Sequence, residues 1–388
     1  MFVSNCLQKL RILDNFYFYL QVVEIALTFL LFCFVCLKFT LFVSLLNISK
    51  QKRIFIANDQ YPNISILIAA RNEENNIIDC LKSLELLDYH KNNIEILIGN
   101  DQSTDETEQL ITEFIQGKAY FKLINIPNKM GKAKAKANVL AHLFEQSTHE
   151  IIFVTDADIH VNSNWVKSIV PYFNNPKTGI VSGTTIVNGK GFFANMQSID
   201  WLYFSGLLIA FDNLGLKSTA VGNNMAVSKK AYLATGGYQN LDFSVTEDLA
   251  LFTAIKNQGY ESINLLENDN LNQSKPQYSL INFLHQRKRW LIGAQGLNLK
   301  WKAVFMLMAL FYPMLIFLFF YNSKNAMTIW ICKIFIQFFL SIIISLKLKK
   351  LPNVFYLLIF EIYTFISTFI VTIFYVLPIK MIWKNRNY

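Results

Sequence analysis

Four long apolar runs constrain this chain more than any other feature of its sequence. They cover residues 16–46, 304–321, 326–346 and 354–379 of 388. A helix needs about 20 predominantly apolar residues to cross a bilayer, so each run is long enough to span, the second only barely. The first is too long for the apolar core of a signal peptide. The sequence therefore predicts an integral membrane protein with one N-terminal helix and two or three C-terminal spans.

The composition agrees with a membrane protein and argues against a nucleic-acid-binding one. Hydrophobic residues make up 53% of the chain, and its formal net charge is +9. Much of the basic excess lies beside the apolar runs, as is typical of membrane flanks, and none of the usual nucleic-acid-binding motifs is present. We therefore expect membrane lipids, and no nucleic acid, among the partners.

Basic residues at the ends of the apolar runs indicate which flank faces the cytoplasm, and the flanks give conflicting answers. The cluster at residues 49–53 follows the first run, which places the next domain in the cytoplasm. The lysines within 347–350 and the basic tail at 380–386 also favour the cytoplasm, but three C-terminal spans would put that tail outside. One run is therefore expected to be re-entrant or interfacial. The run at 304–321, short and interrupted by Pro313, is the first choice.

The stretch between the membrane regions predicts an α/β domain. Apolar strand-like segments alternate with segments of helical spacing, which indicates βαβ units and a mainly parallel sheet with helices on both faces. The expected strands are 64–70, 94–99, 121–126 and 151–155, and the expected helices are 74–87, 107–115 and 132–144.

Two further segments, 192–216 and 280–301, predict helices at the membrane surface, with a core helix of the domain as the alternative for the first. The chain then divides into an N-terminal helix with its basic flank (1–53), an α/β domain with interfacial helices (62–301) and a C-terminal membrane region (302–388).

Two carboxylates follow the fourth predicted strand. Asp156 and Asp158 stand one residue apart where the buried strand 151–155 ends. Buried acids need a compensating cation, and Mg²⁺ or Mn²⁺ is commonly held by one or two carboxylates plus the phosphates of a substrate. Taken alone, the pair is as readily explained by a capping Asp and a solvated Asp in a loop.

Polar clusters follow the other predicted strands too, at 70–74, 100–107 and 128–132. The carboxyl ends of parallel strands meet at one edge of a sheet, where open α/β sheets bind ligands. Each cluster by itself is more often a turn or helix cap. Four in succession favour a site for a nucleotide diphosphate, with lysines offsetting its charge.

Two more motifs lie farther along the chain. Glu247 and Asp248 precede a helical segment, either as favourable acids in its first turn or with one as a general base. Gln286, Arg289 and Trp290 combine an amide, a cation able to neutralise a leaving diphosphate and an indole able to stack on a sugar ring. Taken alone, that second motif is an ordinary basic interfacial patch.

Together these motifs resemble membrane-embedded family 2 glycosyltransferases with a GT-A catalytic domain, a broad group that includes cellulose, chitin and hyaluronan synthases and ceramide glucosyltransferases. They follow the group's order over about 230 residues. The matching segments are 69–73, 101–105, Gly131-Lys132 with Asn138, 156–158, 222–226 with 236–238, 246–248, and Gln286, Arg289 and Trp290.

The resemblance implies a role for each residue. Those implied to bind the donor nucleotide are Glu73, Asp101, Lys132 and Asp156. Asp158, with Asp156, would hold Mg²⁺ or Mn²⁺, and Asp248 would be the catalytic base. The residues implied for the acceptor and diphosphate end are Glu247, Gln286, Arg289 and Trp290. Asn100 departs from the pattern, because many relatives have Asp there.

The implied activity is inverting transfer of a sugar, from a nucleotide sugar such as a UDP-sugar, to a membrane-associated lipid or polysaccharide acceptor. A processive polysaccharide synthase with its own translocation path is one alternative, and a non-catalytic subunit of the same shape is another. The absence of organelle signals favours a bacterial inner membrane, with the catalytic domain in the cytoplasm. The sequence does not identify the sugar or the acceptor.

Overall fold

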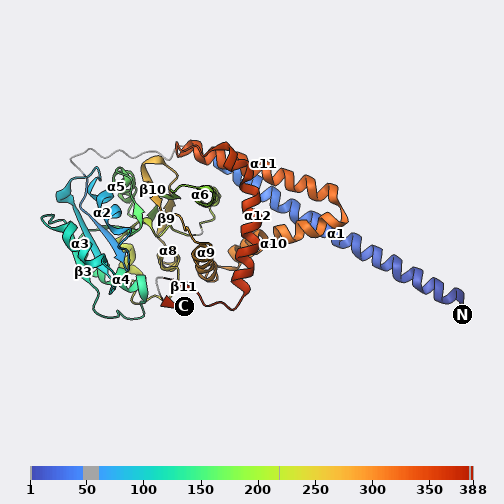
Figure 1. The fold of residues 1–388 in the computed structure, drawn as a ribbon, viewed down its shortest axis with the longest axis horizontal. Coiled ribbons are helices and arrows are strands. Elements are labelled where there is room, and N and C mark those ends of the chain that lie inside the picture. The colour runs from blue at the N-terminus through green and yellow to red at the C-terminus, as the bar shows by residue number, and fades with distance from the viewer. Residues whose placement is uncertain (1, 47–60, 218, 384–385, 388) are drawn as a thin grey trace. The chain divides into compact units, whose positions relative to one another are not determined.

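The computed structural model describes residues 2–46, 61–217, 219–383 and 386–387 (Figure 1). The chain forms two compact units. One contains Met1–Val43 and Asn298–Leu340, and the other contains Ser44–Leu297 and Ser341–Tyr388. The predicted basic cluster at 49–53 lies outside the described residues.

The first unit is helical. It is built from α1 (Phe2–Leu46), α10 (Leu299–Tyr321) and most of α11 (Ser323–Lys347). Phe34 packs on Phe311 with ring centroids 4.5 Å apart. The Asn322 amide donates to Glu24 Oε1 at 2.7 Å, so the carboxylate of Glu24 has a polar partner inside this unit.

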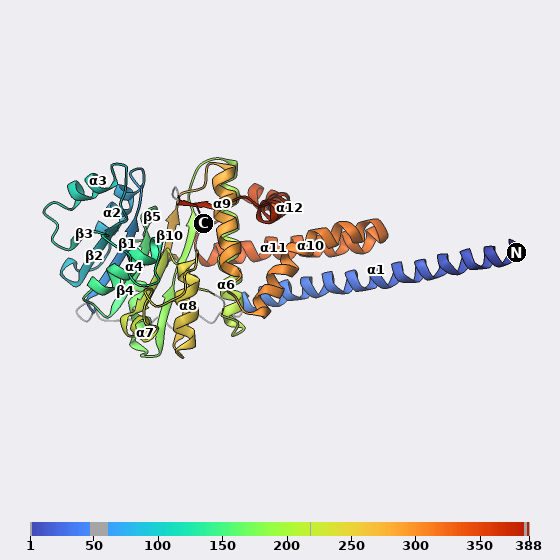
Figure 2. The same cartoon turned by 90° about the horizontal axis from the view of Figure 1, so that it is seen from below.

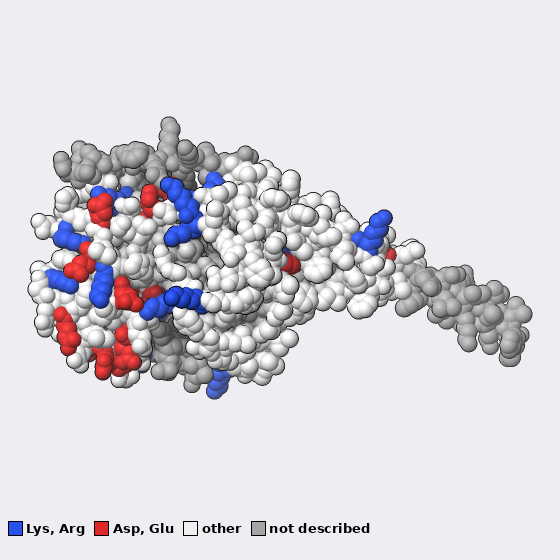
Figure 3. Space-filling view, turned by 45° about the horizontal axis from the view of Figure 1, so that its top comes forward, with Lys and Arg blue, Asp and Glu red and all other residues white. Residues whose placement is uncertain are grey.

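Among the described residues, four helices are long and apolar enough to cross a membrane: Phe18–Leu46 of α1, α10, α11 and α12 (Val354–Val376). On the face drawn in Figure 3, charged side chains gather over the α/β part and are sparse on the long helices. The predicted membrane protein fits this structure. The run at 304–321 is part of a longer helix than the sequence suggested, because α10 begins earlier, at Leu299, and continues through Pro313 over 23 residues. The choice of this run as the re-entrant or interfacial one stays a prediction. Proline is tolerated in membrane helices when neighbouring groups satisfy the backbone.

The second unit contains a seven-stranded sheet, in the order β3-β2-β1-β4-β8-β6-β9. The strands β1 to β4 pair in parallel, and β8 runs antiparallel to both of its neighbours. This confirms the predicted α/β class with a mainly parallel sheet. The strands are β1 (Ile64–Ala70), β2 (Ile94–Asn100), β3 (Phe121–Asn125), β4 (Ile151–Asp156), β6 (Thr178–Ser182), β8 (Asn224–Ser228) and β9 (Glu261–Asn264).

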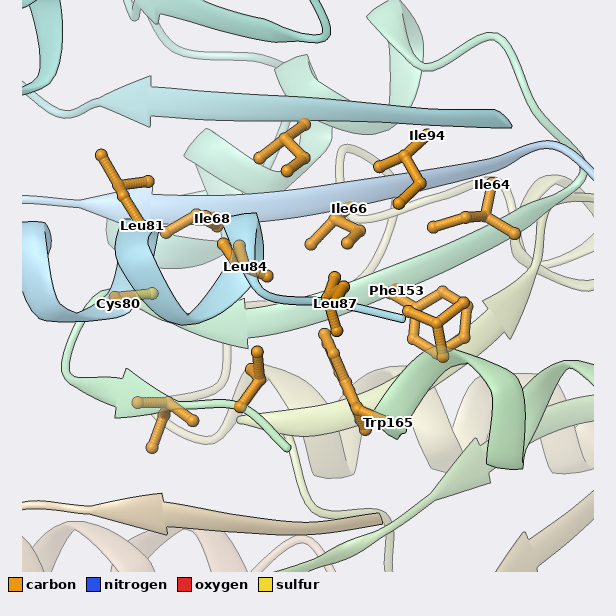
Figure 4. Close-up of a cluster of buried hydrophobic side chains, with 14 of the residues drawn as sticks. Ile64, Ile66, Ile68, Cys80, Leu81, Leu84, Leu87, Ile94, Phe153 and Trp165 are labelled. Atoms are coloured by element: carbon orange, nitrogen blue, oxygen red, sulfur yellow. The ribbon is translucent and has the colours of Figure 1, made fainter. Parts of the chain in front are cut away.

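Helices cover both faces of this sheet. On one face lie α2 (Ile77–Glu85), α3 (Thr107–Ile115) and α5 (Trp165–Ile169), whose apolar side chains form a core with alternate residues of β1 (Figure 4). On the other face lie α4 (Ala135–Gln146), α7 (Lys229–Ala234) and α8 (Glu247–Asn257), with a second core. The central strands β1, β2 and β4 are buried on both faces, which is why they read as continuous apolar runs.

A smaller sheet and three long helices complete this unit. The small sheet has the order β5-β10-β7, with β5 (Ile159–His160), β10 (Leu271–Ser274) and β7 (Thr184–Val187). The helices α6 (Phe192–Asn213) and α9 (Leu280–Ala294) both contact α12. The chain then ends in β11 (Ile382–Trp383) and β12 (Arg386–Asn387), and Figure 2 shows α9 and α12 from a second side.

The predicted elements are present, with differences at their ends. The helix expected from residue 74 begins at Ile77, because Asn76 and Ile77 first close a turn on the Glu73 carbonyl. The helix expected from 132 begins at Ala135, after a loop in which Gly131 has a φ of +50°. The segment 280–301 divides into α9 and α10, and the Asn298 side chain caps α10.

Candidate functional site

A cleft opens where β1, β2 and β4 end. It encloses about 880 Å³, its open mouth included. Six of the predicted site residues line it: Glu73, Asp101, Asp156, Asp158, Glu247 and Arg289. Five chain segments that are far apart in sequence thus contribute charged groups to one place at the carboxyl edge of the sheet.

The loops after β1 and β2 hold each other in place. The Asn72 side-chain oxygen accepts from the Thr104 amide at 2.9 Å, and the Glu73 amide donates to Thr107 Oγ1 at 2.7 Å. The Asn76 amide group donates to Glu73 Oε2 at 2.8 Å. The acids and amides of these loops are therefore partly structural, and they fix the carboxylate of Glu73 at the cleft wall.

Asn100 has a structural role that accounts for its departure from the expected Asp. Its Nδ2 donates to Glu108 Oε2 and to Asn125 Oδ1, both at 2.9 Å. Its Oδ1 accepts from the Ser103 amide at 3.1 Å. An Asp here could not donate and would face the Glu108 carboxylate. Asp101, buried next to it, is the residue of the pair that lines the cleft.

Lys136 links the two acidic motifs, and the sequence analysis did not select it. Its ammonium lies 2.5 Å from Asp156 Oδ1 and 2.6 Å from Glu247 Oε1. Burial opposes the charge on Lys136, but the two carboxylates raise its pKa above the ordinary value. The alternating lysines at 132, 134 and 136 were a visible signal, yet the sequence does not indicate which one faces the cleft.

Glu247 and Asp248 are neighbours with opposite pKa shifts. Burial opposes the charge on Glu247, but Lys136 and Arg289 hold its pKa below the ordinary value. Burial and the charge of Glu247 together raise the pKa of Asp248 to about 6. Two adjacent acids with separated pKa values can divide tasks, one staying ionised and the other able to accept a proton near neutral pH.

Two glycines make room for the segment that carries these acids. The Gly222 amide donates to Asp248 Oδ2 at 3.0 Å, and a Cβ on Gly222 would lie 2.6 Å from that oxygen. A Cβ on Gly293 would lie 2.1 Å from Thr246 Oγ1. Any larger residue at either position would push residues 246–248 away from their place.

Four predicted site residues are not among those that line the cleft: Lys132, Asp248, Gln286 and Trp290. Lys132 pairs with the exposed Asp242 at 2.9 Å. Gln286 is buried. Trp290 packs on Trp201 of α6 and under the Arg287 guanidinium, which in turn pairs with Asp200. Asp248 directly follows a cleft residue and is half-buried, whereas Trp290 contributes to packing between α6 and α9.

The cleft fits a divalent cation of the hard, oxygen-binding type. Asp156 and Asp158 both line it and supply carboxylate oxygens. Among the described residues, no group of three or more His, Cys, Asp or Glu side chains could hold a metal without other ligands. Mg²⁺ in particular is bound by one or two carboxylates plus substrate phosphates, so this donor set suits an ion that arrives with a diphosphate.

Comparison with known proteins identifies the family. The model of glycosyl transferase family 21 matches residues 27–388. The chain belongs to glycosyl transferase family 21. It is therefore a glycosyltransferase, as predicted, and the non-catalytic alternative is not supported. The matched family is numbered 21, whereas the sequence motifs suggested family 2.

Several curated bacterial proteins are similar to this chain. The probable glycosyltransferase YdaM of Bacillus subtilis (strain 168) is 28% identical over 73% of this chain and 69% of its own length. The beta-monoglucosyldiacylglycerol synthase of Synechocystis sp. is 26% identical over 60% and 48%. The poly-beta-1,6-N-acetyl-D-glucosamine synthase of Staphylococcus epidermidis is 29% identical over 50% and 46%. The chain thus spans about half the length of the last two.

A solved structure shares the fold. The mannosyltransferase PcManGT from Pyrobaculum calidifontis, solved in complex with GDP-Man and Mn²⁺, superposes with a TM-score of 0.57 at 16% identity. The superposition covers 91% of this chain and 97% of that one. At this identity the likeness concerns the fold alone, and it confirms the predicted GT-A-like architecture.

Proposed function

We propose that this glycosyltransferase moves a sugar from a nucleotide-sugar donor, a UDP-sugar in the first instance, to a membrane-associated acceptor with inversion at the anomeric carbon. One observation carries the proposal. One cleft at the carboxyl edge of the sheet brings together two acids suited to a divalent metal, a third acid and a cation. They are Asp156 and Asp158, Glu247, and Arg289.

The donor lies along the β1–β4 side of the cleft in this proposal. Glu73 and Asp101 contact the base and ribose, because both are buried at the ends of their strands and present carboxylates to the cleft. Asp156 and Asp158 hold Mg²⁺ or Mn²⁺, which when bound neutralises charge on the diphosphate. Lys136, rather than Lys132, is the lysine beside them.

The transfer step uses Asp248 as the base. Its carboxylate takes the proton of the acceptor hydroxyl, the hydroxyl oxygen attacks the anomeric carbon, and the bond from that carbon to the diphosphate oxygen breaks. The nucleoside diphosphate leaves with the bonding electron pair, and Arg289 offsets its charge. A carboxyl pKa of about 6 suits a base that acts near neutral pH.

The acceptor is a lipid in the preferred form of the proposal. Four helices could span a membrane, and the Synechocystis relative is named for making a glucosylated diacylglycerol. The three relatives described above are bacterial, which supports a bacterial inner membrane. The lysines at 347, 349 and 350 support a catalytic domain in the cytoplasm.

The test is release of nucleoside diphosphate by the purified full chain in detergent, across a panel of UDP- and GDP-sugars, with and without Mn²⁺ or Mg²⁺. We expect metal-dependent release with one donor. Asp158→Ala should lose donor binding. Asp248→Asn should bind donor normally and lose at least about 100-fold in release, the usual contribution of a general base.

Glu113→Gln serves as the matched control, because Glu113 is an exposed acid that accepts a hydrogen bond from Gln109 on its own helix and does not line the cleft. It should behave as wild type. The proposal fails if the protein binds no donor, or if Asp248→Asn transfers sugar as fast as wild type.

A processive polysaccharide synthase is the second candidate, favoured by the similarity to the poly-beta-1,6-N-acetyl-D-glucosamine synthase. The length of the labelled product on a denaturing gel separates the two. One discrete glycolipid supports single addition, and a ladder or smear supports the processive synthase.

A further inference from the structure

The helix α12 is attached to the α/β unit along its whole length. Near its start, Tyr356 meets Phe192 of α6, with ring centroids 6.2 Å apart. One turn later Phe360 meets Tyr203, also of α6. Near its end, Phe374 meets His285 of α9 at 5.2 Å. A helix that leaves a domain to cross a bilayer would touch that domain at one end only.

The end of α12 is held most firmly. Lys288, buried on α9, donates to the carbonyl oxygens of Phe374 at 3.1 Å and Leu377 at 2.9 Å. The Phe374 carbonyl is one that the last turn of a helix leaves without a partner, and a cation there is also favoured by the helix dipole. The Leu377 carbonyl, just past the end of α12, also accepts from the Ile379 amide at 2.7 Å. Gln295 of α9 donates to the Tyr375 hydroxyl at 2.6 Å.

The chain then returns to the catalytic cleft. Met381, five residues after α12 ends, is buried and lines the cleft together with Glu73, Asp101 and Arg289. The segment after α12 is therefore on the same side of the membrane as the catalytic domain. Because an odd number of crossings between domain and tail would separate them, α10, α11 and α12 cannot all cross.

The helix α6, on which α12 packs, contacts the last residues of two apolar helices, α1 and α11. The Asn213 amide of α6 donates to the carbonyl of Ser44, near the end of α1. Gly206 of α6 faces Ile344, near the end of α11, so closely that a Cβ on the glycine would lie 1.9 Å from Ile344 Cδ1. The start of the bilayer is therefore beside α6, and α12 lies beside α6 as well.

The outward face of α12 is apolar from end to end. Its exposed large apolar residues recur every three or four positions, as one helix face requires. They are Val354, Phe355, Leu358, Ile362, Ile366, Ile370, Ile373 and Val376. Within α12, Thr372 is the one exposed polar residue, and the single charged residue, Glu361, is buried on the inward side.

Basic residues stand at both ends of this face. Lys349 and Lys350 precede α12, Lys380 follows it, and all three are exposed. Lysines beside an apolar helix favour the cytoplasmic headgroups, where anionic lipid attracts them. A crossing helix would carry one set to the opposite side, whereas a helix parallel to the surface keeps both sets in the favoured layer.

We propose that α12 does not cross the membrane but lies in its surface, with the outward apolar face immersed in the leaflet nearest the catalytic domain and its flanking lysines on anionic headgroups. The chain then crosses three times, through α1, α10 and α11. This arrangement removes the conflict between the flanking charges, because the tail stays on the cytoplasmic side.

The test is the depth of spin labels placed one at a time on the outward face, at Leu358, Ile362, Ile366, Ile370 and Ile373. The full chain is reconstituted into vesicles of phosphatidylethanolamine and phosphatidylglycerol, and depth is read from collisions with oxygen and a nickel chelate. We expect all five labels at a similar depth, about 5–10 Å below the headgroups. A depth that rises to the bilayer centre and falls toward the other leaflet would overturn the proposal.

The helix α11 supplies the reference scan within the same chain. Labels at its exposed residues Met327, Ile331, Phe335 and Phe339 should show the profile of a crossing helix, deepest near the middle. Labelled proteins are used only if they keep the nucleoside diphosphate release of the unlabelled protein. A misfolded variant therefore cannot imitate a shallow helix.

A second measurement addresses the side of the tail directly. In a cysteine-free background, Lys380→Cys and Glu113→Cys are exposed to a membrane-impermeant maleimide in intact cells and after permeabilisation. We expect both to react only after permeabilisation. Reaction of Lys380→Cys in intact cells, with Glu113→Cys still protected, would show that α12 crosses and would overturn the proposal.

Discussion

At the scale of single residues, the site depends on how its acids are compensated. Asp156 and Glu247 come from different elements and share the ammonium of Lys136. Arg289 adds a second cation on the Glu247 side. Lys136 and Arg289 also lower the pKa of Asp248, but burial and the charge of Glu247 outweigh them. The two adjacent acids differ because Lys136 forms its ion pair with Glu247.

The pH dependence of the reaction should report Asp248. Because burial raises the pKa of this carboxyl to about 6, the base is progressively protonated below that value. We expect kcat/KM to fall about tenfold per pH unit below pH 6 and to level off above it, measured as nucleoside diphosphate release from pH 4.5 to 8. A rate that stays constant down to pH 5 would exclude Asp248 as the base.

The raised pKa of Asp248 favours the reaction above pH 6 but lowers the stability of the fold in the same pH range. A carboxyl with an ordinary pKa of 3.8 and a raised folded value destabilises the fold when ionised. Its contribution to stability should therefore increase as the pH falls through 6 toward 3.8. Asp248→Asn should melt at a higher temperature than wild type at pH 7, and the two should converge near pH 4.

Gly222 should matter for rate because of the space that it leaves. In Gly222→Ala, the new methyl group would lie 2.6 Å from both Cβ and Oδ2 of Asp248, which must then move. We expect kcat to fall at least about 10-fold with the donor KM little changed, since misplacement of a reacting group by about 1 Å is costly.

Gly296→Ala is the control for this substitution, because the only atom within 4 Å of the added Cβ is a carbonyl oxygen at 3.4 Å. Its kinetics should match wild type. Equal kcat values in the two alanine variants would contradict the positioning of Asp248 by Gly222.

Asn100→Asp should destabilise the protein although many members of the related group were expected to carry Asp there. The new carboxylate would replace a donor to Glu108 and Asn125 and would repel the Glu108 carboxylate. We expect a loss of about 1–3 kcal/mol in the free energy of unfolding. The measurement is the thermal melting temperature in detergent, and Asn100→Asp with Glu108→Gln should regain part of it.

At the scale of elements, α9 joins the site to the end of α12. It carries Arg289 into the cleft, Gly293 against Thr246, and Lys288 onto the carbonyls of Phe374 and Leu377. Two consecutive turns of one helix therefore support the catalytic acids and the returning tail. A substitution that breaks the contacts at the end of α12 should for this reason alter the cleft.

Lys288→Met tests that connection. Without the ammonium, the last carbonyls of α12 lose their partner, and the segment that brings Met381 to the cleft is released. We expect the donor KM to rise several-fold, measured by nucleoside diphosphate release at varied donor concentration. Lys230→Met, at an exposed lysine of α7, should leave the donor KM unchanged, and an unchanged value in Lys288→Met would refute the connection.

At the scale of the whole molecule, the α/β unit is not complete without the C-terminal residues. The unit contains Ser341–Tyr388 as well as Ser44–Leu297, and α12 covers apolar side chains of α6 and α9. A protein limited to residues 61–297, which lacks the apolar helix α1 as well as α10, α11 and α12, should keep a mixed α/β circular dichroism spectrum in mild detergent. In buffer without detergent it should elute in the void volume of a gel-filtration column, because that apolar surface is uncovered.

A monodisperse truncated protein in plain buffer would contradict this dependence on α12. The full chain in the same detergent is the reference for both measurements.

The sequence by itself determined the fold class and most of the cleft. Strand periodicity is a local property, and so is the placing of polar clusters directly after apolar strands. Because parallel strands must end at one edge, Glu73, Asp101, Asp156 and Asp158 could be assigned to one site before any contact was known. The four apolar helices were likewise readable, because length and hydropathy suffice to identify them.

Only the tertiary structure decided which of several similar residues reaches the cleft. Lys136 rather than Lys132 does so because the loop through Gly131 sets where α4 begins. Trp290 packs on Trp201 and does not line the cleft, and this contact joins two helices, α6 and α9, that are far apart in the sequence. The same holds for α12: its hydropathy is that of a crossing helix, and only its contacts with α6 and α9 distinguish the two placements. Hydropathy records what a residue prefers as a neighbour, whereas tertiary contacts determine whether lipid or protein is that neighbour.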